Sequence, residues 1–102
     1  MSLKPGANDM NDLKAILITT AHKGVWYAEV PADYDLTART FLHLRNARCA
    51  LYWATTGGVQ EFAVKGPNAR SRIGIACDID VLHDITAVWP VSDAARKAWK
   101  AK

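Results

Sequence analysis

Two short apolar runs joined by a glycine-containing loop are the strongest constraint on how this chain folds. The first run is Leu13–Thr20 and the second is Val25–Val30, with Ala21–Gly24 between them. In the second run, Trp26 and Val30 fall on one face of an extended chain, and the residues at odd positions fall on the other. The pattern predicts an antiparallel β-hairpin, so we expect the fold to be built on a sheet.

Three further runs are predicted as strands, because each is apolar and is bounded by Gly, Pro or polar turn residues. They are Val59–Val64, which follows the turn Thr55–Gly58, then Arg72–Cys77 and Ile85–Val91. Pro90 lies near the end of the last run. Since proline has no N–H to donate, this run is expected at an edge of the sheet.

The segment 36–54 is compatible with two structures. Its apolar residues recur at helical spacing, and Asp35 before them could cap a helix. They also alternate as strand residues do, on either side of a polar bend at Arg45–Arg48. Propensity does not decide between the two, because aromatic residues favour a strand while alanines, leucines and arginines favour a helix. We favour the two strands.

The last residues carry the signature of a helix. Ser92 is expected to cap it, and Asp93 places a negative charge at the positive end of the helix dipole. Lysines occupy the other end, and Trp99 falls on the apolar stripe. We therefore expect this helix to pack Trp99 onto the sheet.

A chain of 102 residues, 50% of them hydrophobic, is sized for one domain that buries a core without disulfides or metals. We expect an α+β fold that is mainly β: a small antiparallel β-barrel or sandwich of about six or seven short strands with one C-terminal helix. Residues 13–102 are expected to form this single domain. Residues 1–12 show no periodicity and are expected to be a disordered tail or a cloning remnant, with Met10 as an alternative start.

Basic residues gather in the middle of the sequence. Between Arg39 and Arg72 there are six Lys and Arg residues against one acid, Glu61. Small β domains bind single-stranded nucleic acid by pairing such cations with phosphates and stacking bases on exposed aromatic rings. Because the net charge is only +3, nucleic-acid binding is the alternative function rather than the first. Its candidate site comprises Arg45, Arg48, Tyr52, Arg70 and Arg72.

The aromatic residues indicate the function that we favour. Four Trp, three Tyr and two Phe are many for a small domain, and they either fill one core or contribute to an interface. Pairing between copies is a common way to cover an open sheet edge, so a homo-oligomer is expected. The predicted function is a non-enzymatic assembly or binding module that self-associates. Its candidate interface residues are Trp26, Trp89 and Trp99.

Motifs for catalysis and metal binding are not found in the sequence. Asp78, Asp80, His83 and Asp84 have the ligand types for a divalent cation, but their spacing matches neither a calcium loop nor a zinc site. This stretch is predicted to be a solvated loop. Cys49 is the candidate nucleophile if a histidine lies beside it, but its apolar surroundings predict a core position. We therefore expect no enzyme activity, no cofactor and no metal.

The sequence also bears on where the protein is found. Its longest uncharged apolar runs reach about seven residues, far below the roughly 20 that span a bilayer. Residues 1–12 lack the plan of a secretory signal. Cys49 and Cys77 are expected to be free thiols in a reducing compartment. These observations predict a cytoplasmic protein with no membrane partner.

Three stretches are distinctive as a set: KAILITTAHKGV (Lys14–Val25), LRNARCALYW (Leu44–Trp53) and LHDITAV (Leu82–Val88). They resemble a family of small uncharacterised proteins associated with tailed bacteriophages and with bacteria that carry prophages. The likeness covers about residues 14–99, and the family usually has Lys where this chain has Arg45, so the positive charge is kept. The resemblance implies a bacterial or phage cytoplasm and assigns no catalytic or binding residue.

Overall fold

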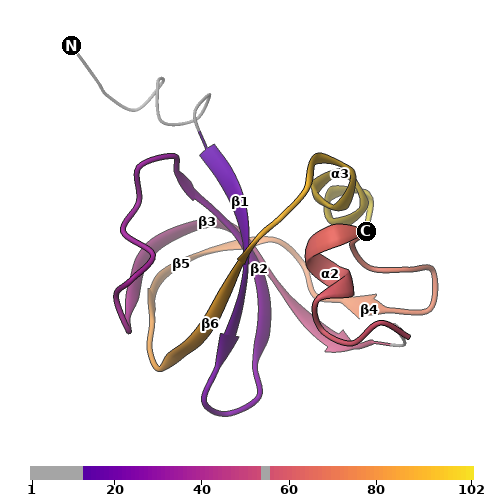
Figure 1. The fold of residues 1–102 in the computed structure, drawn as a ribbon, viewed down its shortest axis with the longest axis horizontal. Helices are drawn as coiled ribbons and strands as arrows, with labels where there is room; N and C mark the ends of the chain where they lie inside the picture. The colour runs from indigo at the N-terminus through magenta and orange to yellow at the C-terminus, as the bar shows by residue number, and fades with distance from the viewer. Residues whose placement is uncertain (1–12, 54–55) are drawn as a thin grey trace.

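The computed structural model describes residues 13–53 and 56–102, and Figure 1 shows how their elements are arranged. Residues 1–12, predicted as a tail, and residues 54–55, predicted at a strand end and a turn, lie outside the described residues. In chain order the elements are β1 (Leu13–Thr20), β2 (Val25–Pro31), β3 (Phe41–Tyr52), α2 (Glu61–Val64), β4 (Arg72–Ile73), β5 (Cys77–Leu82), β6 (Ile85–Pro90) and α3 (Asp93–Ala101).

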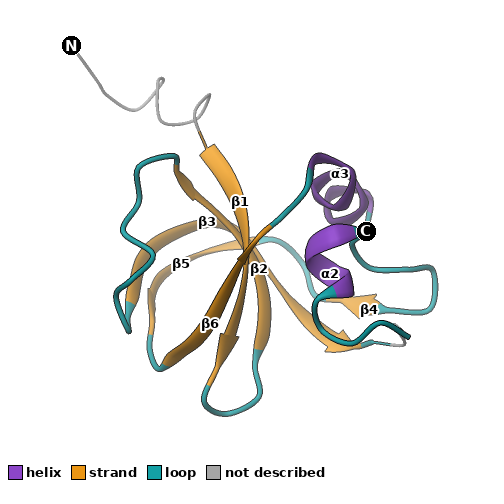
Figure 2. Ribbon diagram, viewed as in Figure 1, coloured by secondary structure: helices purple, strands orange, loops and turns teal. Residues whose placement is uncertain are grey.

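Six strands form one antiparallel sheet. Its hydrogen-bonded order is β4-β3-β2-β1-β6, with β5 also paired to β3. This path is an open sheet, and Figure 2 shows both helices gathered on the side of the molecule where β4 lies. The prediction of a mainly β, antiparallel fold with a C-terminal helix is confirmed. The order also places β6 at an edge, as Pro90 indicated.

The predicted hairpin is formed by β1 and β2, which pair in register along their length. In the turn, Lys23 has a φ of 66°, and the Thr20 N–H donates to the Gly24 carbonyl at 3.0 Å. A Cβ at Gly24 would lie 2.6 Å from the Thr20 hydroxyl oxygen. A side chain at this position would displace the Thr20 or Trp26 side chain, so the turn favours glycine.

Both faces of the hairpin are buried, each in its own hydrophobic cluster. The helix-side core consists of Ala15, Leu17, Val25, Tyr27, Phe62, Ala63 and Trp99. The strand-side core consists of Ile16, Ile18, Ala28, Val30, Phe41, Leu44 and Ala47. Successive residues of β1 alternate between the two cores, as the side-chain period of a strand requires.

The segment with two possible structures is a strand, so the preference for strand over helix is confirmed. It is one continuous strand of 12 residues, β3, rather than two strands with a bend. One edge of β3 pairs with β2, and the other pairs first with β5 and then with β4. Arg45 and Arg48 remain in the ladder, while Asn46 between them takes a φ of 51° at an irregularity in the register. The polar stretch is therefore a β-bulge, not a bend.

The strand predicted at Val59–Val64 is wrong. This segment contains the short helix α2, in which the Phe62 and Ala63 side chains are buried. The Ala63 N–H donates back to the Gln60 carbonyl at 2.9 Å, as in a helical turn. A helix of four residues is too short for its apolar spacing to differ from that of a strand.

The loop predicted at Asp78–Asp84 is also wrong, because most of it forms β5. Ile79 and Leu82 of this strand pack against the strand-side core. Aspartate is depleted in strands, so Asp78 and Asp80 concealed these apolar positions. The neighbouring strand predicted at Arg72–Cys77 is shortened to the two residues of β4.

The C-terminal helix begins and packs as predicted. The Ser92 hydroxyl accepts the Ala95 N–H at 3.0 Å and donates to the Val64 carbonyl at 2.7 Å, which ties α3 to α2. Trp99 is fully buried, and its indole N–H donates to the Phe62 carbonyl at 3.0 Å. Its ring stacks on Tyr27 with the ring centres 5.2 Å apart. The cap at Ser92 and the core position of Trp99 are confirmed.

Candidate functional site

The four arginines predicted to contact phosphates do not share one face of the molecule. Arg48 is half-buried, and its guanidinium donates to the Gly74 carbonyl at 2.8 Å and to the Trp99 carbonyl at 2.7 Å. A cation at this place is favourable because it meets the negative end of α3. Arg48 therefore fastens the last turn of the helix to the sheet.

The other three arginines are exposed, but at two separate places. Arg45 lies on β3, seven residues before Tyr52. At the rise of a strand, that separation is about 20 Å. Arg72 lies directly opposite Tyr52 in the ladder between β3 and β4, and Arg70 precedes it in the chain. The structure thus brings Tyr52, Arg70 and Arg72 to one end of the sheet and leaves Arg45 apart.

The three tryptophans predicted at an interface do not meet on one surface. Trp99 has no exposed area and therefore offers nothing to another copy, so it belongs to the core and not to an interface. Trp26 and Trp89 are both half-buried, Trp26 against the strand-side core and Trp89 against the helix-side core. Because they lie on opposite faces of the sheet, no shared surface contains them.

A different set of apolar side chains is exposed. Of the seven large hydrophobic residues that are exposed in the described chain, five belong to the end of β3, to α2 and to the segment after β4. Figure 1 shows these elements side by side at one end of the molecule. We call this set the apolar end; it comprises Leu51 (66% exposed), Tyr52 (54%), Trp53 (40%), Val64 (62%) and Ile75 (87%).

Neighbouring elements approach one another at two places in the apolar end. The Trp53 ring packs edge-on against Phe62 of α2, with the ring centres 5.6 Å apart. A Cβ at Gly74, the residue before Ile75, would lie 4.0 Å from a methyl carbon of Leu51. Exposed cations border these residues, and we call them the basic rim: Lys65, Arg70 and Arg72.

Sequence reasoning missed the apolar end because alternating apolar residues also fit a covered strand. One signal was available. Leu51, Tyr52 and Trp53 are three consecutive large apolar residues, so they point to both faces of a strand. Pairing with the two residues of β4 satisfies the edge of β3 at this end but does not cover its faces.

The acidic stretch forms a second exposed surface. Asp78 and Asp80 are exposed on β5. Leu42 of β3 and Val81 of β5 are cross-strand neighbours and are 45% and 46% exposed. We call these four residues the acidic surface.

The acidic stretch is not arranged as a metal site. Within residues 13–53 and 56–102, no group of three or more His, Cys, Asp or Glu side chains is placed to hold a metal ion. Asp78 instead accepts the backbone N–H of Asn46 at 3.0 Å, at the bulge of β3. His83 lies 3.3 Å from the hydroxyl of Thr40. These contacts attach β5 and the following turn to β3.

Glu29 is a charged residue buried beneath α3. Its carboxylate accepts hydrogen bonds from the Tyr27 hydroxyl and, at 2.8 Å, from the Asn46 side chain, and it lies 3.5 Å from Arg96 and 3.3 Å from Lys100. Burial by itself raises the pKa of Glu29, but these hydrogen bonds and cations outweigh it, so the pKa lies below its ordinary value. Arg96 and Lys100 are one helical turn apart, so the ionised carboxylate anchors α3.

A small cavity of about 210 Å³ adjoins this network and is lined by Tyr27, Asn46, Arg48, Ala76 and Lys100. The polar side chains in this lining already have partners within the chain: Tyr27, Asn46 and Lys100 contact Glu29, and Arg48 contacts backbone carbonyls. Such a satisfied network stabilises a fold. It does not present a group aimed at a substrate.

Cys49, the candidate nucleophile, is half-buried on β3. Burial raises the pKa of its thiol. A catalytic cysteine needs the opposite shift, because the thiolate is the reactive form. Its place in the sheet is therefore structural.

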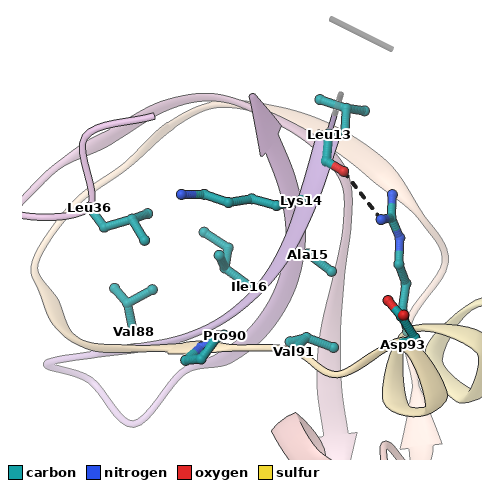
Figure 3. A pocket seen from close by; sticks show the side chains of 10 residues that line it. Leu13, Lys14, Ala15, Ile16, Leu36, Val88, Pro90, Val91 and Asp93 are labelled. Carbon is teal, nitrogen blue, oxygen red and sulfur yellow. Dashed lines mark hydrogen bonds between the residues drawn. The ribbon is translucent and has the colours of Figure 1, made fainter. Parts of the chain in front are cut away.

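An open groove of about 540 Å³ lies between β1, β6 and Leu36, and Figure 3 shows its mainly apolar lining. At its mouth Arg96 donates to the Leu13 carbonyl at 3.2 Å. The strand edge beside the groove is interrupted, because Pro90 has no N–H and the Ile85 N–H is bonded to the Arg39 carbonyl at 2.9 Å. The groove is thus a poor template for an added strand.

A comparison with protein families matches residues 13–99 to the family described as Domain of unknown function (DUF6948). The chain belongs to this family. The matched range includes both cores, the apolar end and the acidic surface of this chain.

Two further comparisons, with curated proteins and with solved structures, found no match to the chain. In the part of the DUF6948 domain that the structure describes, no helix is long and apolar enough to cross a membrane. The function of the domain is therefore inferred from its own surfaces.

Proposed function

We propose that this DUF6948 domain is a non-enzymatic binding module that assembles with further copies of itself through the apolar end. The observation that supports this is the exposure of five large apolar side chains at one end of a domain whose two cores are already filled. Exposed apolar side chains bordered by polar residues can mark an interaction site in a soluble protein.

The composition of the apolar end suits a protein partner. Leu51, Val64 and Ile75 are aliphatic, so they gain from burial against other apolar side chains but offer no ring for a base to stack on. Protein interfaces typically combine an apolar and aromatic centre with a polar rim in which arginine is frequent. Tyr52 and Trp53 supply the aromatic part, and the basic rim supplies the border.

Sedimentation velocity of the full chain tests this proposal. We expect a molar mass that rises with concentration between about 1 and 200 μM, the range in which modest interfaces associate. Ile75→Ser places a polar group at the most exposed apolar position and is expected to shift the equilibrium toward monomer. The matched control Ile75→Val keeps the side chain apolar and is expected to associate as the wild type does. A wild-type chain that is monomeric throughout this range would contradict the proposal.

A second candidate function is single-stranded nucleic-acid binding, and it is favoured by one specific observation. Tyr52 is more than half exposed and faces the exposed Arg72 across the ladder, with Arg70 nearby in the chain. This combination can stack a base and contact phosphates. The site is smaller than the sequence suggested, since Arg48 is held by backbone carbonyls and Arg45 lies elsewhere.

Fluorescence anisotropy with labelled single-stranded DNA and RNA at about 50 mM salt tests this second function, because low salt strengthens phosphate contacts. If it holds, Tyr52→Ala should weaken binding by about 1 to 3 kcal/mol with little change in salt dependence. Arg72→Gln should lower the slope of log affinity against log salt by about 0.7. No change in anisotropy up to about 100 μM protein would exclude it, being weaker than ordinary non-specific binding.

The proposal includes a cellular setting. We place the protein in the cytoplasm of bacteria that carry phages or prophages, in keeping with the resemblance of its three sequence stretches. Cys49 and Cys77 are both free thiols, which suits a reducing compartment. A mass spectrum of protein from such cells, alkylated before lysis, is expected to show both thiols labelled, and a disulfide between them would contradict this setting.

A further inference from the structure

We propose that copies of this domain associate head to tail, with the apolar end of one copy against the acidic surface of the next. This inference rests on the proposed self-association and specifies its geometry. The inference depends on one observation: the exposed apolar side chains lie on two surfaces that carry opposite charge.

All seven large hydrophobic residues that are exposed in the described chain belong to one of these two surfaces. Five form the apolar end, which is bordered by the basic rim of Lys65, Arg70 and Arg72. The other two, Leu42 and Val81, pair across strands on the acidic surface beside Asp78 and Asp80. Each surface therefore pairs apolar area with one predominant sign of charge.

Charge decides which surfaces can meet. A twofold contact between two apolar ends would bring two basic rims together, and juxtaposed like charges disfavour an interface. Contact between the apolar end and the acidic surface brings Arg70 and Arg72 toward Asp78 and Asp80, which is complementary. Two exposed arginines lie in the same region, Arg45 on β3 and Arg39, whose carbonyl accepts the Ile85 N–H at 2.9 Å. Against Asp78, Asp80 and Asp84 they leave one net negative charge on this side.

The two surfaces occupy different parts of the fold. The apolar end is built from the C-terminal part of β3, from α2 and from the chain around β4, whereas the acidic surface is built from β5 and the N-terminal part of β3. Figure 1 shows α2 and β4 on one side of the molecule and the paired part of β3 and β5 toward the other. One copy can therefore use both surfaces at once, and such an association closes into a ring or continues as a filament.

Charge reversal on each surface tests the head-to-tail geometry by sedimentation velocity. Arg72→Glu and Asp80→Lys, each measured alone, are expected to raise the dissociation constant of self-association by about tenfold or more. Mixing the two variants is expected to restore binding and give a heterodimer, because Arg72→Glu keeps an intact acidic surface and Asp80→Lys keeps an intact basic rim. Arg70→Glu serves as a second basic-rim variant, and circular dichroism verifies that each variant is folded.

Matched controls change the net charge by the same amount at other exposed positions. Lys97→Glu on α3 and Asp33→Lys after β2 are expected to associate as the wild type does. If the wild type associates but Asp80→Lys does so equally well and the mixture gains nothing, the head-to-tail contact is wrong while self-association stands. If the wild type is monomeric, the proposed function itself is wrong, and the head-to-tail contact with it.

Discussion

The β1–β2 hairpin and the strand β3 beside it use their apolar residues differently. In the hairpin, apolar residues on both faces are buried in the helix-side and strand-side cores. In β3, Phe41 and Leu44 are fully buried, yet Leu42, Leu51 and Tyr52 are exposed. The domain thus packs two cores and leaves these large apolar side chains in solvent. The difference separates residues that stabilise this fold from residues available for binding.

Among the substitutions considered, Trp99→Ala is expected to lower the free energy of unfolding most. Trp99 is fully buried, stacks on Tyr27 and donates a hydrogen bond to the Phe62 carbonyl. Its removal leaves a cavity and an unpaired carbonyl, so we expect the free energy of unfolding to fall by about 3 to 5 kcal/mol. Denaturant titration measures this. A loss near that of an exposed site, about 0.5 kcal/mol, would mean that α3 does not pack as described.

Glu29→Gln is expected to cause the next largest fall in the free energy of unfolding. The neutral amide leaves Arg96 and Lys100 without a charged partner, although both are partly exposed and recover some hydration. We expect a loss of about 2 kcal/mol, below that of breaking a fully buried ion pair. The same titration measures it, with Glu61→Gln as a control, because the Glu61 side chain is only partly buried and its carboxylate accepts one backbone N–H, from Gly57 at 2.9 Å. Equal effects of the two substitutions would show that the anchor of α3 lies elsewhere.

Acidification should weaken the same anchor. Because the pKa of Glu29 is lowered in the folded chain, its contribution to stability is present above the ordinary glutamate pKa of about 4.3 and is lost as the pH falls through the lower folded value. Denaturant titrations between about pH 6 and pH 3 should therefore show a steeper loss for the wild type than for Glu29→Gln. Parallel curves would contradict an ionised, stabilising Glu29.

Ser92→Ala is expected to cost about 1 kcal/mol, since it removes the cap of α3. It also removes the hydrogen bond to the Val64 carbonyl that ties the two helices together. Ser92→Thr retains a hydroxyl that can both accept the Ala95 N–H and donate to the Val64 carbonyl, and it should recover most of the loss in a denaturant titration. If both variants are as stable as the wild type, the helix does not depend on this cap.

Ile75→Ser should have the smallest effect on the free energy of unfolding. It tests whether an exposed apolar residue contributes to binding rather than to folding. Ile75 is 87% exposed, so its replacement is expected to change the free energy of unfolding by less than about 0.5 kcal/mol. Measured at a dilution where the chain is monomeric, a larger loss would show that this side chain supports the fold rather than an interface.

The elements that the sequence predicted are those with a strong local signal. The hairpin follows from two apolar runs joined by a loop in which glycine is favoured, and α3 follows from the Ser92 cap and the Trp99 stripe. The elements that were missed lack such a signal. The helix α2 has only four residues, and the apolar positions of β5 are interrupted by Asp78 and Asp80.

The candidate site was harder to predict than the fold because exposure depends on partners distant in sequence. Arg48 is unavailable to a ligand since the carbonyls of Gly74 and Trp99 hold it, and neither contact is visible in the local sequence. Tyr52 and Arg72 are 20 positions apart and become neighbours only through the pairing of β3 with β4. The exposure of Leu51 likewise depends on which elements pack on this end of the sheet, and periodicity does not reveal that.

Hydrogen–deuterium exchange at two protein concentrations tests most directly whether the exposed apolar surfaces are where copies meet. Between about 2 and 200 μM, a range that spans typical weak association, we expect exchange to slow in peptides that cover residues 49–53 and 72–82. Peptides from β1 and β2 should exchange at the same rate at both concentrations, because their protection comes from folding alone. Identical exchange everywhere, or slowing confined to β6, would contradict the account.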